Sequence, residues 1–370
     1  MATLLRMTFA AILGLVVALP SVLAQEPQRP STTVAWRDGK ELRAEGQGFP
    51  GSADAWVRLP AAAADTVPKP VWELAQDSAG IAVRFVTDSQ SIRARWTLRR
   101  DRIALPHMAA SGASGLDLYR REGERWRWLA ATQPKAKQNS VELIRFADKA
   151  SQPAEYLCYL PLYNGVESFE IGVDDGATLE PAAPRPATRK PIVFYGTSIT
   201  QGASASRPGM CHVAILGRRL DRETINLGFS GNGRMELALA DLLAGIDAAI
   251  YVVDCLPNMS PEQVGERAEP FVRRLRERRP GVPILLVEDR TFANAHALPK
   301  RADDHRRRRA ALRAAYDRLR AAGFDRLDYL GGDRLLGDDD DATVDSSHPS
   351  DLGFFRQADA FEPVLTALLR

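Results

Sequence analysis

Polar residues that together could cleave an ester are spread over the second half of the sequence. Ser198 could attack a carbonyl carbon, and His348 could take its proton. Asp345 could hold the imidazole ring and stabilise its charged form. The backbone N–H groups of Ser198 and Gly231, with the side-chain amide of Asn258, could stabilise the oxyanion. A serine hydroxyl reacts slowly until a base removes its proton, and the histidine can be that base. These residue types together therefore predict a serine nucleophile.

Apolar runs after Lys190 predict the strands that position these residues. The runs are PIVFYG, TINLGF, AAIYVVD, PILLVE and RLDYL. Each is too uniformly apolar to be half exposed, which favours a parallel sheet covered on both faces. Amphipathic helices lie between them, one after Ser260 as N-cap with Pro261 in its first turn, and another over about 303–322. The alternation predicts a doubly wound, flavodoxin-like α/β domain with a parallel five-stranded sheet over residues 191–370.

In such a domain the ligand site lies at the carboxyl ends of the strands. Ser198 follows the first predicted strand, Gly231 the second and Asn258 the third. Asp345 and His348 come after the fifth strand, in DSSHPSDLG. We therefore expect these residues to meet at one edge of the sheet.

Each catalytic assignment has a structural alternative. Ser198 could be only a helix N-cap. His212 is the main rival base, because it lies near Ser198 in the sequence at the start of a helix. It has no carboxylate at a matching spacing, and a helix N-terminus disfavours an imidazolium. His107 lies in the first half of the chain, His296 in a polar loop and His305 in an arginine run.

Other polar residues near the site have competing interpretations. Asp345 could belong to the acidic loop GDDDD, where a calcium site is disfavoured by the ligand spacing. Gly231 could be only a turn glycine, and Glu288 and Asp289 could support the site or cap the next loop. The basic run 306–309 is interpreted as a mostly solvated helix face rather than a polyanion site. No residue spacing indicates a zinc site, and we expect no metal and no cofactor.

The first half of the chain has a different periodicity. Over residues 31–174 the apolar residues mostly alternate, as in 81–100 and 155–173, with Gly, Pro, Asp and Asn between the runs. This pattern predicts an all-β domain, a sandwich or jelly roll. Residues 175–190 contain prolines and no periodicity, as expected of a short stiff linker. We expect the two domains to pack together rather than swing freely.

The first 24 residues have the pattern of a signal peptide. Arg6 precedes a long apolar run that ends in Val22, Leu23 and Ala24, so cleavage is expected after Ala24. An uncleaved membrane anchor is the alternative, although the run is short for a bilayer span. We expect a bacterial protein that is periplasmic or secreted, with no stable membrane insertion after cleavage.

Cysteine content and composition limit the remaining classes. Cys158, Cys211 and Cys255 are too few for a disulfide framework and are expected to be buried free thiols, with a Cys211–Cys255 bridge left open. The 370 residues carry a formal net charge of +2 and are 45% hydrophobic, which is ordinary globular composition. Nothing in this composition suggests nucleic acid as a partner, and the oligomeric state stays open.

The ordered set of candidate residues resembles the SGNH hydrolases, the GDSL-type esterase family, whose blocks carry Ser, Gly, Asn and His in this order. Residues 196–198 (GTS) match the first block, with Thr where many members have Asp, and residues 230–232 (SGN) match the second. Residues 345–349 (DSSHP) match the block that carries the histidine and its aspartate. Residues 256–259 (LPNM) depart from the common Gly-x-Asn-Asp, so Asn258 is assigned by its place after the third strand.

The β half also resembles a known domain. SGLDLY (114–119) matches the Gly-x-Asp-Leu-Tyr signature of an N-terminal domain that accompanies one SGNH branch, and YLPLYNGV (159–166) is similar to another stretch of it. Together the two resemblances cover nearly the whole mature chain.

These resemblances imply an exported serine esterase that forms an acyl-enzyme on Ser198. The β half resembles carbohydrate-binding sandwiches, which implies short acyl groups such as acetyl on a sugar or glycan, or another small-molecule ester. One alternative is an acyltransferase that passes the acyl group to an alcohol acceptor. The other is a non-catalytic glycan-binding protein, although decay of the enzyme would be expected to remove at least one of Ser198, Asp345 and His348.

Overall fold

The computed structural model describes residues 33–49, 54–148 and 152–370. The predicted signal peptide lies outside the described residues. Within the described ranges, no helix is both long and apolar enough to cross a bilayer. Residues 34–370 form one compact unit, in which a β region and an α/β region are in contact.

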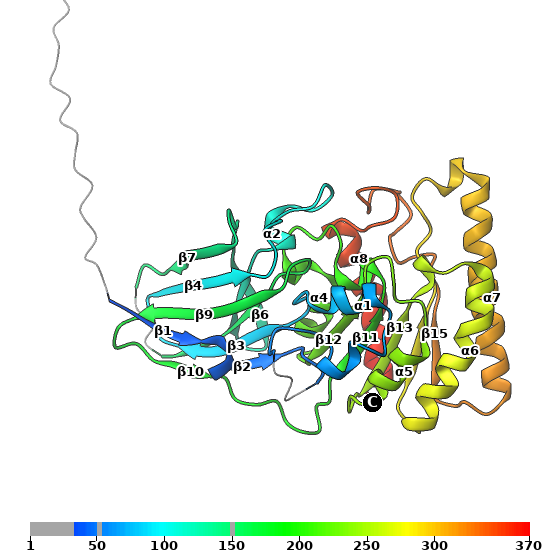
Figure 1. Ribbon diagram of the computed structural model, residues 1–370, viewed down its shortest axis with the longest axis horizontal. Coiled ribbons are helices and arrows are strands. Elements are labelled where there is room, and N and C mark those ends of the chain that lie inside the picture. The colour runs from blue at the N-terminus through cyan, green and yellow to red at the C-terminus, as the bar shows by residue number, and fades with distance from the viewer. Residues whose placement is uncertain (1–32, 50–53, 149–151) are drawn as a thin grey trace, which may run out of the picture. The chain divides into compact units, whose positions relative to one another are not determined.

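Two antiparallel sheets form the β region (Figure 1). The first has the strand order β1 (Val34–Asp38), β9 (Val166–Asp174), β4 (Ser91–Leu98) and β7 (Gln138–Arg145). The second has the order β10 (Leu179–Pro181), β3 (Ala82–Thr87), β8 (Ala154–Tyr159), β5 (Asp117–Glu122) and β6 (Arg125–Ala131), with β2 (Arg43–Glu45) paired to β3. Trp56, Phe85 and Trp96 belong to the core of this region. The predicted sandwich is confirmed.

A parallel five-stranded sheet forms the centre of the α/β region. Its order is β12 (Thr224–Gly228), β11 (Ile192–Gly196), β13 (Ile250–Asp254), β14 (Ile284–Val287) and β15 (Leu327–Leu330). This 2-1-3-4-5 order is that of the flavodoxin-like folds, as predicted. All five predicted runs form strands. The first four are buried between two layers of helices, whereas β15, at the edge of the sheet, is only partly buried.

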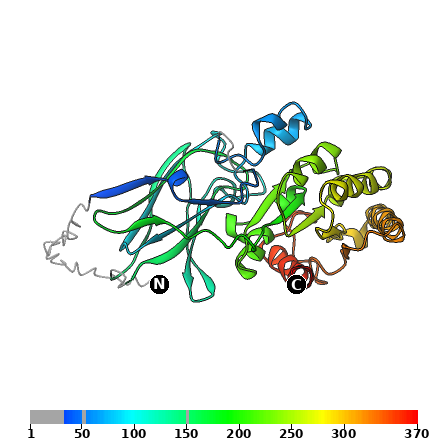
Figure 2. The ribbon, with the colours of Figure 1, turned by 90° about the horizontal axis from the view of Figure 1, so that it is seen from below.

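The helices of the α/β region cover both faces of this sheet (Figure 2). One face carries α4 (His212–Arg219) and α8 (Asp351–Leu368), and the other carries α5 (Leu237–Ala244), α6 (Pro261–Arg278) and α7 (Pro299–Ala321). A one-turn helix, α3 (Ser198–Gln201), directly follows β11. The 3-10 turns are η1 (Gly39–Glu41), η2 (Ala61–Ala63), η3 (Pro208–Met210), η4 (Leu256–Asn258) and η5 (Ala295–Ala297).

The two helices predicted in most detail are both present. Ser260 caps α6 through a capping box with Gln263, and Pro270 lies inside the helix. The second begins at Pro299, a few residues before the predicted start. The predicted solvation of run 306–309 is only half right: the last two arginines turn inward to pair with Asp289.

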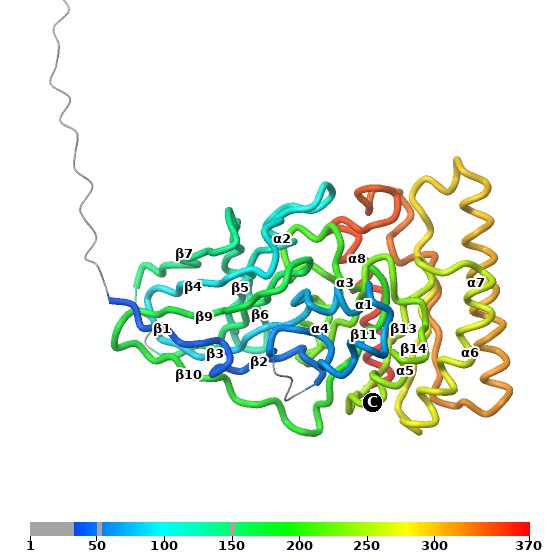
Figure 3. Tube along the Cα trace, viewed as in Figure 1, coloured from blue at the N-terminus to red at the C-terminus, as the bar shows by residue number. Residues whose placement is uncertain are grey.

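The β half is not purely β, which corrects the prediction. It also contains α1 (Lys69–Ala75) and α2 (Ala110–Ala113). Around α1, the apolar side chains recur every four residues and pack into the core of the α/β region. They are Leu59, Ala63, Val67, Val71 and Ala75. In Figure 3 the trace of α1 lies alongside that of β11. The first half of the chain therefore completes a core of the second half.

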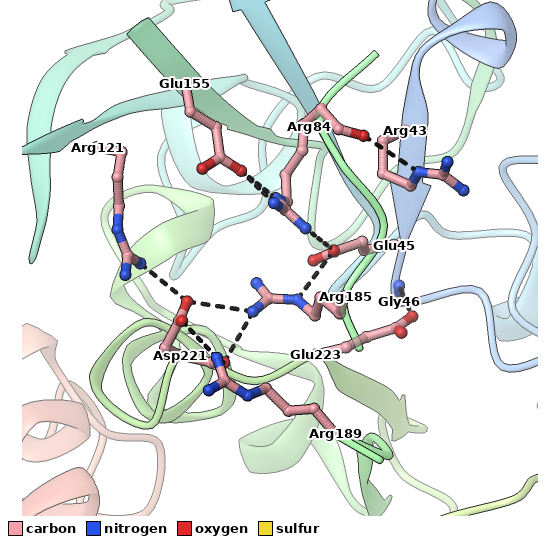
Figure 4. Close-up of polar contacts among 11 residues, drawn as sticks. Arg43, Glu45, Gly46, Arg84, Arg121, Glu155, Arg185, Arg189, Asp221 and Glu223 are labelled. Atoms are coloured by element: carbon pink, nitrogen blue, oxygen red, sulfur yellow. Dashed lines mark hydrogen bonds and ion pairs between the residues drawn. The ribbon is translucent and has the colours of Figure 1, made fainter. Parts of the chain in front are cut away.

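The predicted linker, residues 175–190, is also more structured than expected. Its residues Leu179–Pro181 form β10, which pairs with β3. Arg185 then donates to the Glu45 carboxylate over 2.9 Å and to the Asp221 carbonyl over 2.8 Å (Figure 4). Arg121 of β5 reaches the Asp221 carboxylate at 2.8 Å, so the linker, the β region and the α/β region share one ionic network.

Arg58 makes a second, fully buried connection between the two regions. Its guanidinium donates to the carbonyls of Leu74 and Asp77 on one side and to those of Asn226 and Gly228 on the other. Burial lowers the pKa of Arg58 to about 10, against the opposing effect of the Asp77 charge. The side chain remains cationic at neutral pH and joins four backbone carbonyls.

Replacing Arg58 tests this connection. Arg58→Met should lower the free energy of unfolding by about 3 kcal/mol, because buried carbonyls lose their donors. The measurement is urea unfolding of the full chain, with Arg127→Met as the matched control, since Arg127 is exposed on β6. Equal stability of the two variants would contradict the inferred role of Arg58.

The thiols and one histidine are buried in this fold. Cys158, Cys211 and Cys255 are all free and buried, as predicted, and the Cys211–Cys255 bridge is not formed. His212 lies among aromatic rings, with centroid distances of 5.8 Å to Phe354 and 5.5 Å to Phe361.

His212 has no hydrogen bond to its Nε2 atom among the described residues. Burial lowers its pKa well below the usual 6.5, and the charge of Arg290 lowers it further. His212 is therefore a neutral core residue.

The burial of His212 predicts a pH dependence of stability. The unfolded chain binds a proton near pH 6.5 that the folded chain excludes, so stability is lost as the pH falls below this value. Between about pH 6.5 and about pH 5.5, wild type should lose about 1 kcal/mol more unfolding free energy than His212→Leu. Urea unfolding of both proteins across this range measures the difference. A difference that does not change with pH would contradict a neutral, buried imidazole.

Candidate active site

Ser198 lies at the carboxyl edge of the parallel sheet, in the first turn after β11. Thr197, not Ser198, is the N-cap of α3, and its hydroxyl accepts the Ile199 N–H over 3.3 Å. Gly196 is required here, because a Cβ atom would collide with the Thr200 hydroxyl and the Asp254 carbonyl. Because Thr197 is the N-cap, the N-cap alternative for Ser198 is wrong.

Ser198, His348 and Asp345 form a continuous hydrogen-bonded series. The Ser198 Oγ lies 2.9 Å from the His348 Nε2. The His348 Nδ1 lies 2.7 Å from the Asp345 Oδ2. With Nδ1 protonated toward the carboxylate, Nε2 is free to accept the serine proton.

A tight turn fixes Asp345 toward the histidine. Ser346 adopts φ 74°, and the backbone N–H groups of Ser347 and His348 donate to the Asp345 Oδ1 over 3.0 and 2.7 Å. Burial raises the pKa of the Asp345 carboxyl, but its hydrogen bonds with His348 and Ser347 outweigh this and hold the pKa below its usual value. Asp345 is thus ionised at neutral pH and able to stabilise an imidazolium.

The candidate oxyanion donors come from the loops after β11, β12 and β13. The Ser198 N–H is at the first position of a helix, where no intrahelical acceptor is available. Gly231 adopts φ 69°. The Asn258 side-chain amide donates to the Asn232 carbonyl over 2.6 Å, so it contacts the loop that carries Gly231 and keeps one amide hydrogen for another acceptor.

The β region reaches the site through contacts that the sequence did not indicate. The Tyr163 hydroxyl donates to the Ser198 carbonyl over 3.3 Å. The buried Gln201 amide donates to Asp77 and to the Leu162 carbonyl, while its oxygen accepts the Ser230 N–H. The stretch YLPLYNGV carries Leu162 and Tyr163, and nothing in its local pattern predicts that it reaches Ser198.

His107 is a second missed residue. Its ring stacks on His348, with a centroid distance of 5.6 Å and an angle of 26° between the planes. The loop after β4, cyan in Figure 1, holds His107 in a turn closed by two hydrogen bonds between Leu105 and Met108. Met108 is buried in the same core as Ile199, so the turn is anchored against the α/β region. In the sequence His107 lies in the predicted β half, far from the candidate site residues, and its surroundings indicate no role.

The other histidines lie outside the series. His212 is in the core, and His296 is largely exposed. His305 lies 2.5 Å from Asp289 through Nδ1, and its Nε2 accepts the Phe292 N–H over 3.1 Å. These contacts hold the loop after β14.

The loop after β14 also contacts the turn that carries Asp345 and His348. Glu288 accepts from the Tyr329 hydroxyl over 2.6 Å and from the Gly332 N–H over 2.8 Å. The Ala293 N–H donates to the Ser346 carbonyl over 2.9 Å. Glu288 and Asp289 therefore support the loops around the site.

Among the residues that the structure describes, no group of three or more His, Cys, Asp or Glu side chains could hold a metal ion. The functional groups at this edge are the Ser198 hydroxyl, the His348 imidazole, the Asp345 carboxylate and the Asn258 amide.

Two families match nearly the whole described chain. Residues 189–366 match the GDSL-like lipase/acylhydrolase family. Residues 34–179 match the GxDLY family, the N-terminus of SGNH-hydro-type esterases. No curated protein matches at a significant level.

Solved structures share the architecture. A protein described as a GDSL-like lipase, from Bacteroides ovatus, is 34% identical, with a TM-score of 0.86 over 91% of this chain and 98% of that chain. The salicylyl-acyltransferase SsfX3 from a tetracycline biosynthetic pathway is 19% identical, with a TM-score of 0.73 over 90% and 97%. A family two carbohydrate esterase from Cellvibrio japonicus is 13% identical, with a TM-score of 0.61 over 91% and 98%.

The first of these relatives decides the family, since it is similar in both sequence and fold over nearly its whole length. The other two are similar in fold alone. The chain belongs to the GDSL-like lipase/acylhydrolase family of SGNH hydrolases, in the branch with a GxDLY N-terminal region, and is an ester-hydrolysing enzyme.

Proposed function

We propose that this enzyme is an exported serine esterase that removes short acyl groups, acetyl above all, from a carbohydrate through an acyl-enzyme on Ser198. The observation that carries the proposal is the hydrogen-bonded series from the Ser198 hydroxyl through His348 to Asp345. Export is supported by the signal-peptide pattern of residues 1–24.

Each residue of the series has a defined step. As the Ser198 Oγ attacks the ester carbon, the His348 Nε2 takes its proton, and Asp345 stabilises the imidazolium. The N–H groups of Ser198 and Gly231 and the free amide hydrogen of Asn258 donate to the oxyanion. His348 then protonates the leaving alcohol, and the reverse sequence with water releases the acid and restores Ser198.

A carbohydrate fits the surroundings of this series. The β region places Tyr163 beside Ser198 and His107 beside His348, so residues of both regions surround the candidate catalytic residues. The same two-part fold occurs in a protein named as a family two carbohydrate esterase. Contacts remote from the ester can hold a sugar in reactive geometry.

Ester hydrolysis by wild type and Ser198→Ala tests the proposal. Wild type should release free acetate from 4-nitrophenyl acetate and from acetylated sugars, and the variant should lose more than about 10³-fold in kcat. Intact-protein mass spectrometry after rapid quenching should show one acyl group on wild type only. Equal turnover by both proteins would rule out Ser198, and acyl transfer to an added alcohol without release of acid would make the enzyme an acyltransferase.

Asp345→Asn tests the orienting carboxylate. The variant should fold normally and lose about 10⁴-fold in kcat, because an amide permits the wrong imidazole tautomer and cannot stabilise the imidazolium. Asp339→Asn is the matched control, since Asp339 belongs to the neighbouring acidic loop and pairs with Arg356 over 2.6 Å. Comparable kinetics for the two variants would remove Asp345 from the mechanism.

A further inference from the structure

A cleft with a volume of about 530 Å³ lies beside the candidate catalytic residues. Its lining comes from α1, from the loop after β4, and from Tyr163, Ser230 and Asn232. Tyr163 contacts the Ser198 carbonyl, and Ser230 and Asn232 are the neighbours of Gly231. The cleft therefore adjoins the loops that carry Ser198 and Gly231, where the alcohol part of an ester at Ser198 could extend.

Most of the charged side chains that line the cleft already have a partner of opposite charge. The pairs are Glu73 with Lys69 at 3.9 Å, Asp77 with Arg100, and Arg99 with Asp54. Arg102 also lines the cleft, is exposed, and has no ion pair or side-chain hydrogen bond with any residue that the structure describes. Asp101, the residue before it, does not line the cleft. The cleft thus presents one uncompensated guanidinium to its contents.

The backbone that carries Arg102 is fixed by a buried side chain. The Asn164 amide donates to the carbonyls of Arg100 and Arg102 over 3.1 and 3.3 Å, and its oxygen accepts the Arg100 N–H over 3.1 Å. Asn164 also donates to the Ser114 hydroxyl over 3.2 Å. A guanidinium on a fixed backbone loses less freedom when it binds a ligand than one on a mobile loop.

We propose that Arg102 binds an anionic group on the alcohol part of the substrate, and that this group is a carboxylate, as in a hexuronic acid. The inference rests on the proposed function, in which the alcohol part is a sugar. A guanidinium presents parallel N–H donors that match the two oxygens of a carboxylate. The enzyme would therefore prefer acyl esters of acidic sugars to those of neutral sugars.

The test compares two substrates that differ only at C6: a methyl glucosiduronate and a methyl glucoside with the same O-acetyl group. The ratio of their kcat/KM values is measured for the wild-type full chain and for Arg102→Gln, Arg102→Lys and Arg127→Gln. Arg127 is an exposed arginine that does not line the cleft, so its variant removes the same charge elsewhere.

Wild type should prefer the uronate, and Arg102→Gln should lower the ratio about five- to tenfold. Arg102→Lys should retain part of the preference, since lysine keeps the charge but lacks the parallel N–H donors. Arg127→Gln should retain all of it. An equal ratio in wild type and Arg102→Gln, or a wild-type preference for the neutral sugar, would overturn the inference.

A binding measurement separates this inference from the proposed catalytic role. Calorimetric titration of Ser198→Ala with the deacetylated methyl glucosiduronate and methyl glucoside needs no turnover. Tighter binding of the uronate, lost when Arg102→Gln is added, supports the anion site even where Ser198 proves not to be the nucleophile. Equal binding of the two sugars contradicts the anion site and leaves the esterase mechanism intact.

Discussion

The buried amide of Gln201 joins the segments that surround Ser198 at the carboxyl edge of the sheet. A buried amide must have all its polar atoms bonded, and Gln201 meets this need with groups from three parts of the chain: Asp77, Leu162 and Ser230. Gln201 lies in the same single helical turn as Ser198. One side chain therefore links the turn that carries Ser198 to the loop with Gly231 and to the β region.

The ion pairs of Glu45, Arg185 and Asp221 form another contact between the two regions. Arg84, Glu45 and Arg185 are nearly buried, and Asp221 joins them to the α/β region (Figure 4). The attraction within such buried pairs is largely offset by the loss of hydration, but a misplaced arrangement would leave charges unpaired in the interior. The network therefore favours one docking of the β region, the one that brings Tyr163 to Ser198.

The sequence was sufficient to predict the parallel sheet and to place five candidate site residues at the carboxyl ends of its strands. Strands buried on both faces have uniform apolar runs, and parallel strands deliver their following loops to one edge, so Ser198 and His348 could be assigned together. The geometry of Ser198, His348 and Asp345 agrees with that prediction, while their catalytic roles stay predictions. The segment 59–75 was missed because prolines and alanines hide its four-residue spacing. His107 could not be predicted, because its contact with His348 is made only when two distant regions dock.

The apolar stripe of segment 59–75 also affects how the protein is made. This segment is synthesised early, yet the sheet face that covers it is built from strands that follow the whole β region in the chain. Until those strands exist, Leu59 and Val71 have no core to enter, and the nascent chain carries an exposed apolar surface. The β region therefore cannot fold completely before the α/β region has been synthesised. Recombination that exchanged the β region between relatives would have to carry a matching face of the sheet with it.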